Sequence, residues 1–341
     1  MAHPTGSPPE PGVVRIALDA MGADFEPEAA VHAACRAVVD DPRLELRVFG
    51  DPDALDAAVC ALPDEARARI ELAPTSSFVP MDVSPAQALR HGRASSMAAA
   101  LGSVAEGRDA AVVSAGSTGA LMALGRIALG MLPGVERPAL MTAFPVREGR
   151  AWVLDLGANI GVDADRLLEF ALLGRAAVGV LLGRRPRVGL LNIGKEPSKG
   201  PDVIREASRR LAAQAEIDFV GFVEGHDVFA GRADVVVCDG FAGNILLKSA
   251  EGAIGMLLAE LADEARRPVR GLGLRRALGG LRERYDPALH NGASLLGING
   301  IVIKSHAHAS VDGLANAIGL AALEVRRGLI PALERQLWAE A

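Results

Sequence analysis

The chain has 341 residues, half of them apolar and only 4% aromatic, and its formal net charge is −6 at pH 7. A chain of this length can bury a large core, and its many small apolar residues suit α/β layers. The acidic balance argues against a nucleic-acid partner, because contacts with nucleic-acid phosphates need clustered cations.

Three further features exclude other classes of protein. Cys35, Cys60 and Cys238 show neither metal-ligand spacing nor a disulfide framework, which indicates a reducing, cytoplasmic setting. No apolar run reaches about 18 residues, so we expect a soluble protein without a membrane span. Residues 1–12 are rich in Pro and Gly and lack the apolar core of a signal peptide, which predicts a disordered N-terminal tail.

From residue 13 onward, short β-branched runs alternate with longer segments of helical periodicity. Strands are expected at 13–18, 44–49, 70–72, 110–113, 152–156, 188–192, 219–220, 235–238 and 301–303, and helices at 28–39, 95–106 and 118–131. Most of these strands precede a helical pattern, which is typical of a mainly parallel sheet with helices on both faces. Because no linker follows the tail, we expect one domain from residue 13 to residue 341.

One basic segment departs from this alternation. Residues 263–286 contain seven arginines, which are Arg266, Arg267, Arg270, Arg275, Arg276, Arg282 and Arg284. Leu274, Leu278 and Leu281 recur at i, i+4 and i+7, the spacing of an amphipathic helix with a basic flank. The segment is interpreted either as a solvated helical hairpin that projects from the body, or as a docking surface for an acidic partner or an anionic membrane.

The most informative stretch surrounds residue 239. Four apolar residues lead into Asp239, and a Gly-Phe-Ala-Gly bend then leads to Asn244, where a long apolar-periodic segment opens. This pattern predicts a buried parallel strand followed by a turn that carries polar groups to a helix start. In open α/β sheets, ligands bind beyond the carboxyl ends of the strands, so functional groups are expected at the other strand ends as well.

The stretch Ser114-Ala-Gly-Ser-Thr-Gly-Ala120 follows one predicted strand and opens a helix. Its glycines let backbone amides approach a ligand, while Ser114, Ser117 and Thr118 supply hydroxyls, and the helix dipole favours an anion. Because no Lys follows the second glycine, this is not a Walker loop. The loop suits phosphate, and the alternative is a tight turn with a purely structural role.

Two more strand ends carry polar groups. Asp155-Leu-Gly-Ala-Asn159 offers an amide to an anionic oxygen, although Asp and Asn also cap helices and make Asx turns. Gly194-Lys-Glu-Pro-Ser-Lys-Gly200 holds Lys195 and Lys199 over a strand end, where a cation can neutralise a phosphate or a developing oxyanion. The position of Lys199 beside a predicted helix start favours it over an ordinary solvated lysine.

The stretch Lys304-Ser-His-Ala-His308 follows the strand expected at 301–303. A cation, a hydroxyl and an imidazole that leave a buried strand together are costly unless they are paired or used. We expect no metal, because no second pair of ligands accompanies the two His. We expect no Ser-His nucleophile, because adjacent residues on an extended segment point to opposite faces. The first strand end, Asp19-Ala-Met-Gly-Ala-Asp24, lacks the dinucleotide fingerprint, which disfavours a nicotinamide cofactor.

Together these strand ends favour the binding of an oxyanion and a polarised carbonyl, and their order resembles the phosphate acyltransferase (PlsX) family. The matching stretches include IALDAMG at 16–22, PAQALR at 85–90, GLLNIG at 189–194 and DGFAGN at 239–244, with 95–97, 114–120, 137–140, 155–159, 199–200, 295–297 and 304–306. The resemblance runs in order from about residue 15 to residue 329.

The resemblance implies a doubly wound α/β/α sandwich akin to phosphotransacetylases and isopropylmalate-dehydrogenase-like enzymes, working as a homodimer without a cofactor. It implies the reversible reaction of acyl-(acyl carrier protein) with inorganic phosphate to give acyl phosphate and free carrier protein. The product would feed a membrane acyltransferase that acylates glycerol 3-phosphate. The family also places an amphipathic, membrane-associating projection at 266–284, so peripheral association of a cytoplasmic protein with a membrane surface is expected.

Residue roles follow from the resemblance and from the chemistry of each side chain. Lys199 and Asn244 are expected to be the catalytic pair, either polarising the thioester carbonyl or binding the attacking phosphate, and His306 is a candidate donor to the departing thiolate. The expected substrate- and phosphate-binding residues are Asp19, Ser114, Gly116, Ser117, Thr118, Asn159, Asp239, Lys304 and Ser305. The expected membrane- or carrier-docking residues are Arg270, Leu274, Arg275, Arg276, Leu278 and Leu281.

The chain departs from the family pattern at several positions: Ser117 stands where Asn is common, Gly161 and Arg166 where Asp and His are frequent, Lys195 where an acid is usual, and Ala307 where Gly is usual. Three alternatives stay open beside the main hypothesis. The first is a phosphate acyltransferase that uses coenzyme A. The others are a specialised paralogue and a non-catalytic regulator that binds acyl carrier protein or a membrane.

Overall fold

The computed structural model describes residues 12–266, 271–287 and 290–338. Contacts divide the chain into two compact units, unit 1 from residues up to 138 and from 291 onward, and unit 2 from 139 to 290. The single domain expected from residue 13 stays a prediction, and all but the last residue of the expected tail lies outside the described residues.

Unit 1 contains six strands in the order β3-β2-β1-β4-β11-β10. Their bounds are β1 Val14–Asp19, β2 Leu44–Gly50, β3 Ile70–Pro74, β4 Ala111–Ser114, β10 Ala293–Leu296 and β11 Ile301–Lys304. All neighbours pair in parallel except β10, which runs antiparallel to β11. Strand β4 is buried at every residue, as expected for a central parallel strand covered on both faces.

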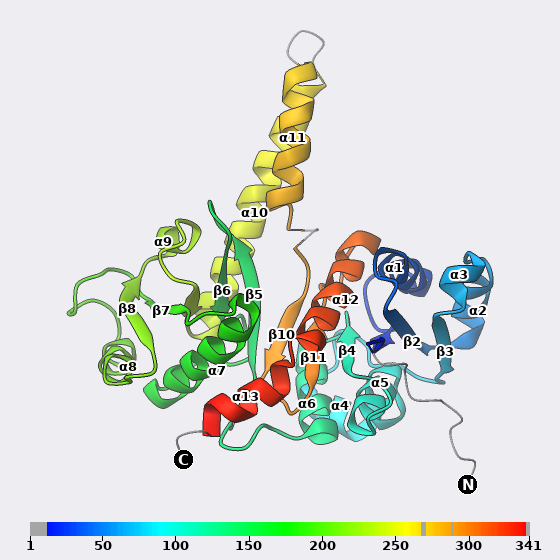
Figure 1. Ribbon diagram of the computed structural model, residues 1–341, viewed down its shortest axis with the longest axis horizontal. Coiled ribbons are helices and arrows are strands. Elements are labelled where there is room, and N and C mark those ends of the chain that lie inside the picture. The colour runs from blue at the N-terminus through cyan, green and yellow to red at the C-terminus, as the bar shows by residue number, and fades with distance from the viewer. Residues whose placement is uncertain (1–11, 267–270, 288–289, 339–341) are drawn as a thin grey trace. The chain divides into compact units, whose positions relative to one another are not determined.

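Helices lie on both sides of the unit 1 strands (Figure 1). Their bounds are α1 Pro27–Asp40, α2 Pro52–Cys60, α3 Asp64–Arg67, α4 Pro85–His91, the 3₁₀ turn η1 Gly92–Ala94, α5 Ser96–Ala105, α6 Thr118–Leu129, α12 Val311–Arg326 and α13 Leu329–Trp338. Helices α1 and α12 pack on each other in one layer, and α4, α5 and α6 form the other. This arrangement is the layered sandwich that the alternating periodicity predicts.

Unit 2 contains five strands in the order β5-β6-β9-β7-β8. Their bounds are β5 Ala139–Pro145, β6 Arg150–Leu154, β7 Arg187–Leu191, β8 Asp218–Val223 and β9 Val235–Val237. Strand β5 runs antiparallel to β6, and the other neighbours are parallel. The carboxyl ends of β6, β9 and β7 therefore lie side by side at one edge of the sheet.

The helices of unit 2 are α7 Ala164–Leu182, α8 Asp202–Ala212, α9 Gly225–Phe229, α10 Gly240–Ala265 and α11 Gly271–Tyr285. Helices α10 and α11 pack along each other as the expected helical hairpin, which projects from the strands of unit 2 (Figure 1). Leu258, Ala265 and Leu278 are buried between the two helices. Among the helices within the described ranges, none is both long and apolar enough to cross a membrane.

The structure confirms the mainly parallel α/β class and corrects several details. The bend expected at 240–243 is wrong, because these residues form the first turn of α10, capped by the Asp239 side chain, which accepts from the Phe241 amide. The strand expected at 219–220 is longer in the structure and extends over 218–223. It continues past Gly221, which interrupts the apolar pattern and has a φ of +85°, and the register with β7 is irregular nearby. The sequence pattern also missed both antiparallel strands, β5 and β10.

Candidate active site

Asp19, Ser114 and Lys304 end three neighbouring strands of unit 1 and are aligned in register. Asp19 accepts a hydrogen bond from the Ser114 hydroxyl on Oδ2 and another from the Ser96 hydroxyl on Oδ1, both at 2.7 Å. Burial raises the pKa of Asp19 to about 6, while these hydrogen bonds and the charge of Lys304 act in the opposite direction. Ser96 is a member of this cluster that the sequence analysis did not select, because it lies within a helix rather than at a strand end.

The Ser114–Ala120 loop is held in place by the side chains of Ser114 and Lys304. The Ser114 hydroxyl accepts from the Gly116 amide at 3.1 Å, and Lys304 Nζ donates to the Ala115 carbonyl at 3.2 Å. Helix α6 then begins at Thr118, with Ser117 as its N-cap residue. The amides of a first helical turn favour an anion, and phosphate binding by this loop stays a prediction.

Ser305 and His306 are held by Asn291, which the sequence analysis also did not select. The Asn291 amide donates to the Ser305 hydroxyl at 2.6 Å, and the His306 backbone amide donates to the Asn291 side-chain oxygen at 2.9 Å. Ser305 is fully buried, whereas His306 is half-buried. No local sequence signal links residue 291 to 305, because the link depends on two segments meeting in the fold.

In unit 2, Asp155 organises the turn after β6. Its carboxylate accepts from the amides of Leu140, Ala158 and Asn159 at 2.9, 3.1 and 2.6 Å, and from the Asn159 side chain at 3.0 Å. Burial raises the pKa of Asp155, and these hydrogen bonds oppose that shift. Asp155 therefore orients Asn159, as the sequence pattern suggested it could.

Helix α10 starts in close contact with that turn. A Cβ on Gly240 would lie 2.3 Å from the Asn159 carbonyl oxygen, and one on Gly243 would lie 2.0 Å from the Asp155 carbonyl oxygen. Only glycine allows this approach at both positions. Asp239 is occupied as a cap, because Oδ1 accepts from an α10 amide and Oδ2 accepts from the Gly161 amide at 2.7 Å. The approach leaves Asn244 exposed in the second turn of α10, beside Gly157.

Lys199 is exposed on the loop between β7 and α8. Asn192, which is 8% exposed, donates from Nδ2 to the Gly194 carbonyl at 3.0 Å and to the Lys199 carbonyl at 3.2 Å. Within the described ranges, no ion pair joins Lys199 to a carboxylate. Its charge is thus available at the strand edge.

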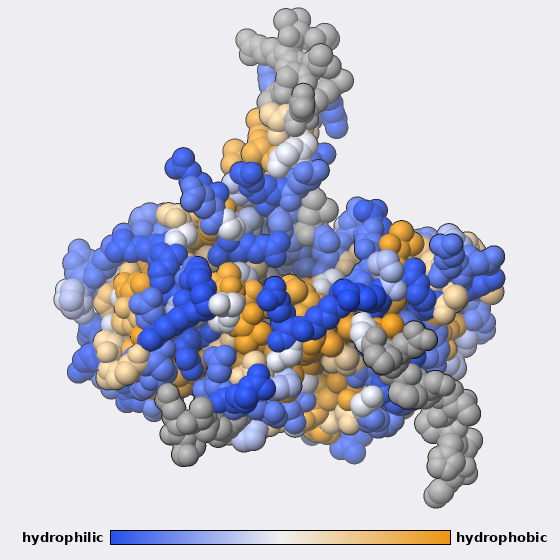
Figure 2. Space-filling model, viewed as in Figure 1, coloured by the Kyte–Doolittle hydropathy of each residue, from blue (hydrophilic) through white to orange (hydrophobic). Residues whose placement is uncertain are grey.

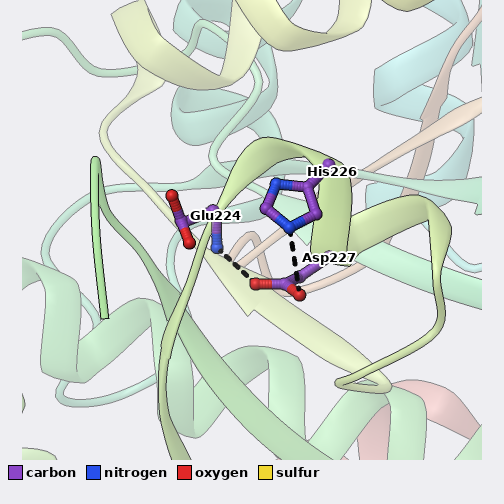
Figure 3. A group of neighbouring side chains, drawn as sticks. All are labelled: Glu224, His226 and Asp227. Carbon is purple, nitrogen blue, oxygen red and sulfur yellow. Dashed lines mark hydrogen bonds and ion pairs between the residues drawn. The ribbon is translucent and has the colours of Figure 1, made fainter. Parts of the chain in front are cut away.

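Lys195, on the same loop, is already paired. Its Nζ lies 2.9 Å from Asp227 Oδ2 and 3.9 Å from Glu224 Oε2. Glu224, His226 and Asp227 present their ligand atoms within 4.8 Å of one another (Figure 3). Glu224 and Asp227 also form the capping box at the start of α9. Lys195 therefore supplies a cation to this acidic group, and the two lysines of the loop have different surroundings.

Asn159, Asn244 and Lys199 follow β6, β9 and β7, whose carboxyl ends are adjacent. Two amides and one unpaired cation at neighbouring strand ends make an arrangement that can stabilise an oxyanion. Unit 1 independently offers a helix start, hydroxyls and Lys304. The sequence-derived roles of these residues remain predictions.

The expected docking residues lie on or near α11. Leu278 is buried against α10, whereas Leu281 is 37% exposed. The backbone of Leu274, Arg275 and Arg276 is helical, and Arg270 lies outside the described residues. Met256 and Leu257 on α10 are 62% and 57% exposed, although the sequence analysis did not select them. Figure 2 shows apolar and hydrophilic surface next to each other on the hairpin.

Comparisons with known proteins agree with this architecture. The family model described as "Fatty acid synthesis protein" matches residues 14–331. The chain is 44% identical over 327 residues to a phosphate acyltransferase of Pseudomonas fluorescens, covering 94% of this chain and 97% of that protein. It is 42% identical over 317 residues to a phosphate acyltransferase of Photobacterium profundum, covering 92% and 93%.

Solved structures of lower identity share the fold. A phosphotransacetylase from Streptococcus pyogenes superposes with a TM-score of 0.62 at 18% identity, covering 92% of this chain and 94% of that one. A branched-chain phosphotransacylase from Enterococcus faecalis V583 superposes with a TM-score of 0.58 at 16% identity, covering 92% and 100%. The expected phosphotransacetylase-like fold is confirmed.

The fold is thus that of the phosphotransacetylases, with polar groups at the ends of its strands. The identities and the extent of the match place the chain more narrowly: it belongs to the phosphate acyltransferase (PlsX) family of fatty acid and phospholipid synthesis.

Proposed function

We propose that this chain transfers a fatty acyl group reversibly from acyl-(acyl carrier protein) to inorganic phosphate, forming acyl phosphate and free carrier protein. The observation that carries this proposal is the edge of unit 2 where Lys199, Asn244 and Asn159 follow adjacent strands. A phosphate oxygen attacks the thioester carbonyl carbon, the C–S bond breaks, and the carrier thiolate takes up a proton. Because phosphate is itself a nucleophile, the enzyme needs only positioning and charge stabilisation.

Lys199 and Asn244 are assigned to the two charges that the reaction handles, the phosphate and the oxyanion of the tetrahedral intermediate. The exposure of both side chains supports this assignment, as does the absence of an acidic partner for Lys199 within the described ranges. Asn159 is assigned to the same pair of charges as Lys199 and Asn244, because the hydrogen bond to Asp155 fixes the Asn159 side chain. Removing one such donor from an oxyanion site typically lowers kcat by about 100-fold or more.

The test uses the purified full-length protein with long-chain acyl-(acyl carrier protein) and phosphate, followed by mass spectrometry of the products. Acyl phosphate should form with wild type and fall by about 100-fold in Lys199→Ala and Asn244→Ala. Lys248→Ala is the matched control, because Lys248 is an exposed lysine of α10 that pairs with Glu251, three residues further along the same helix. Near-wild-type turnover in a folded Lys199→Ala protein would show that the assignment is wrong.

The same assay separates the coenzyme A alternative. Acyl-(acyl carrier protein) and acyl-coenzyme A are compared at equal concentration, and the carrier-protein substrate should give the higher kcat/KM. A protein that binds acyl carrier protein yet releases no acyl phosphate would instead be the non-catalytic regulator.

We further propose that the enzyme is a cytoplasmic homodimer that delivers acyl phosphate to a membrane glycerol-3-phosphate acyltransferase. The α10–α11 hairpin is assigned to peripheral membrane or carrier-protein docking. The exposure of Met256, Leu257 and Leu281 supports this assignment, because apolar side chains beside arginines suit an anionic lipid surface. Co-flotation with vesicles of anionic phospholipid, but not with neutral vesicles, is the expected result.

A further inference from the structure

The loop that carries Lys199 is held together by hydrogen bonds within the loop itself. Strand β7 ends at Leu191 and α8 begins at Asp202. Between them, the buried Asn192 side chain bonds the carbonyls at both ends of the 194–199 segment, and the Lys199 amide donates to the Glu196 carbonyl at 3.0 Å. These bonds fold the segment into a compact turn, but they do not connect it to any other element.

Lys195 supplies that connection. Its ammonium contacts both carboxylate oxygens of Asp227 on α9, at 2.9 and 3.0 Å. The Asp227 side chain is 9% exposed and is itself fixed, because the Glu224 amide donates to its Oδ2 at 3.1 Å. Burial opposes ionisation of Asp227, yet the bonds from Lys195 and Glu224 hold its pKa below the ordinary value. The loop is thus tied to a fixed, ionised carboxylate on a neighbouring helix.

The surroundings of Asp227 favour this ion pair over a metal ion. His226 Nε2 lies 3.6 Å from Asp227 Oδ1, and Arg232 Nη1 lies 3.9 Å from the same oxygen (Figure 3 shows the first of these contacts). Lys195 also places its positive charge next to the carboxylates of Glu224 and Asp227, where a metal ion would otherwise bind. The same pairing neutralises Lys195, so that Lys199 is the lysine of this loop left to meet an anion.

We propose that Lys195 is a positioning residue: by pairing with Asp227 it holds the 194–199 turn against α9 and keeps Lys199 at the strand edge. The inference rests on the proposed role of Lys199. It assigns to Lys195 a mechanical role that differs from that of a second phosphate ligand. Catalysis depends steeply on such placement, since a shift of about 1 Å in a reacting group can cost about 100-fold in rate.

The test compares four single variants and one double variant of the full-length protein in the acyl phosphate assay and by amide hydrogen exchange. Lys195→Met and Asp227→Asn each remove the charge pair, and the Asn side chain can still accept the capping bond from Glu224. Lys195→Arg retains the cation. Arg210→Met is the matched control, because Arg210 is 38% exposed, like Lys195 at 39%, and pairs with Asp165 and Glu206 elsewhere in unit 2.

Lys195→Met and Asp227→Asn should each lower kcat by about 10-fold with KM for the acyl carrier substrate within about twofold. The double variant should lose little more than either single variant, because both changes break one interaction. Exchange of the Lys199 amide should accelerate in both, and Lys195→Arg and Arg210→Met should resemble wild type.

Three outcomes overturn the inference. The first is a Lys195→Met protein that matches Arg210→Met in both measurements, and the second is faster exchange with an unchanged kcat. The third is a fall in kcat without faster exchange, which would indicate direct contact with substrate. Wild-type protein that forms no acyl phosphate contradicts the proposed function itself, and the exchange data then still report whether Lys195 holds the turn.

Discussion

Replacement of Glu324 by Gln tests how strongly the core of unit 1 opposes a buried charge. Glu324 lies on α12, is 1% exposed and accepts a hydrogen bond from the Ser294 hydroxyl on β10. Burial raises the pKa of Glu324 from 4.5 to about 7, and the bond from Ser294 acts against this shift. The folded protein therefore holds this proton more tightly than the unfolded chain does.

The sign and size of the effect follow by linkage. The raised pKa contributes stability that is complete below pH 4.5, is lost as the pH rises toward 7, and then stays absent. At about 1.36 kcal/mol per pKa unit, the interval from 4.5 to about 7 corresponds to about 3 kcal/mol. Glu324→Gln removes the ionisation, so the free energy of unfolding of the variant should gain about 3 kcal/mol on wild type between pH 4.5 and pH 8.

Urea unfolding of both proteins at several pH values between 4.5 and 8 measures this difference. Comparing the difference rather than each stability cancels the titration of the other groups. Glu334→Gln on the exposed face of α13 is the control for the Glu-to-Gln change itself. A pH-independent difference for Glu324→Gln would refute the reasoning, because it would mean that the carboxyl is not destabilised by burial.

Two other carboxylates give contrasting predictions. Burial raises the pKa of Asp19 to about 6. In urea unfolding, the free energy of unfolding of Asp19→Asn should therefore rise relative to that of wild type as the pH increases from 4 to 7. The kcat of this variant should fall about 10-fold, because the Asn side chain cannot accept hydrogen bonds from both Ser96 and Ser114. An unchanged kcat would argue against a role for this cluster. The second carboxylate is Asp234. Burial opposes the ionisation of Asp234, but the hydrogen bonds from Arg184 and Arg187 lower its pKa. Asp234→Asn should therefore destabilise the protein by about 2 kcal/mol at pH 7 in thermal unfolding and progressively less below about pH 4; a loss that stays constant down to pH 2 would contradict this.

The alternation of strands and helices, and the polar groups at most strand ends, were readable from the sequence because they are local. A buried parallel strand is a short β-branched run in the sequence, and the polar side chains at the carboxyl edge of the sheet come directly after it. Lys199, Asn159 and Asn244 were selected as candidates in this way. The first turn of α10 was misread because Gly240 and Gly243 are typical of a bend, and only their close approach to the Asp155 turn explains them in a helix.

The sequence by itself determined the α/β class, the family and which strand ends carry polar groups, since those depend on periodicity and on motifs in order. Tertiary structure decided which of these groups are paired. Whether Lys195 meets a carboxylate, whether Asp19 is bonded by Ser96, and whether Glu324 keeps its proton depend on segments that meet only after folding. Burial and partners at a few ångströms set the charge of a side chain, and neither is encoded in its neighbours along the chain.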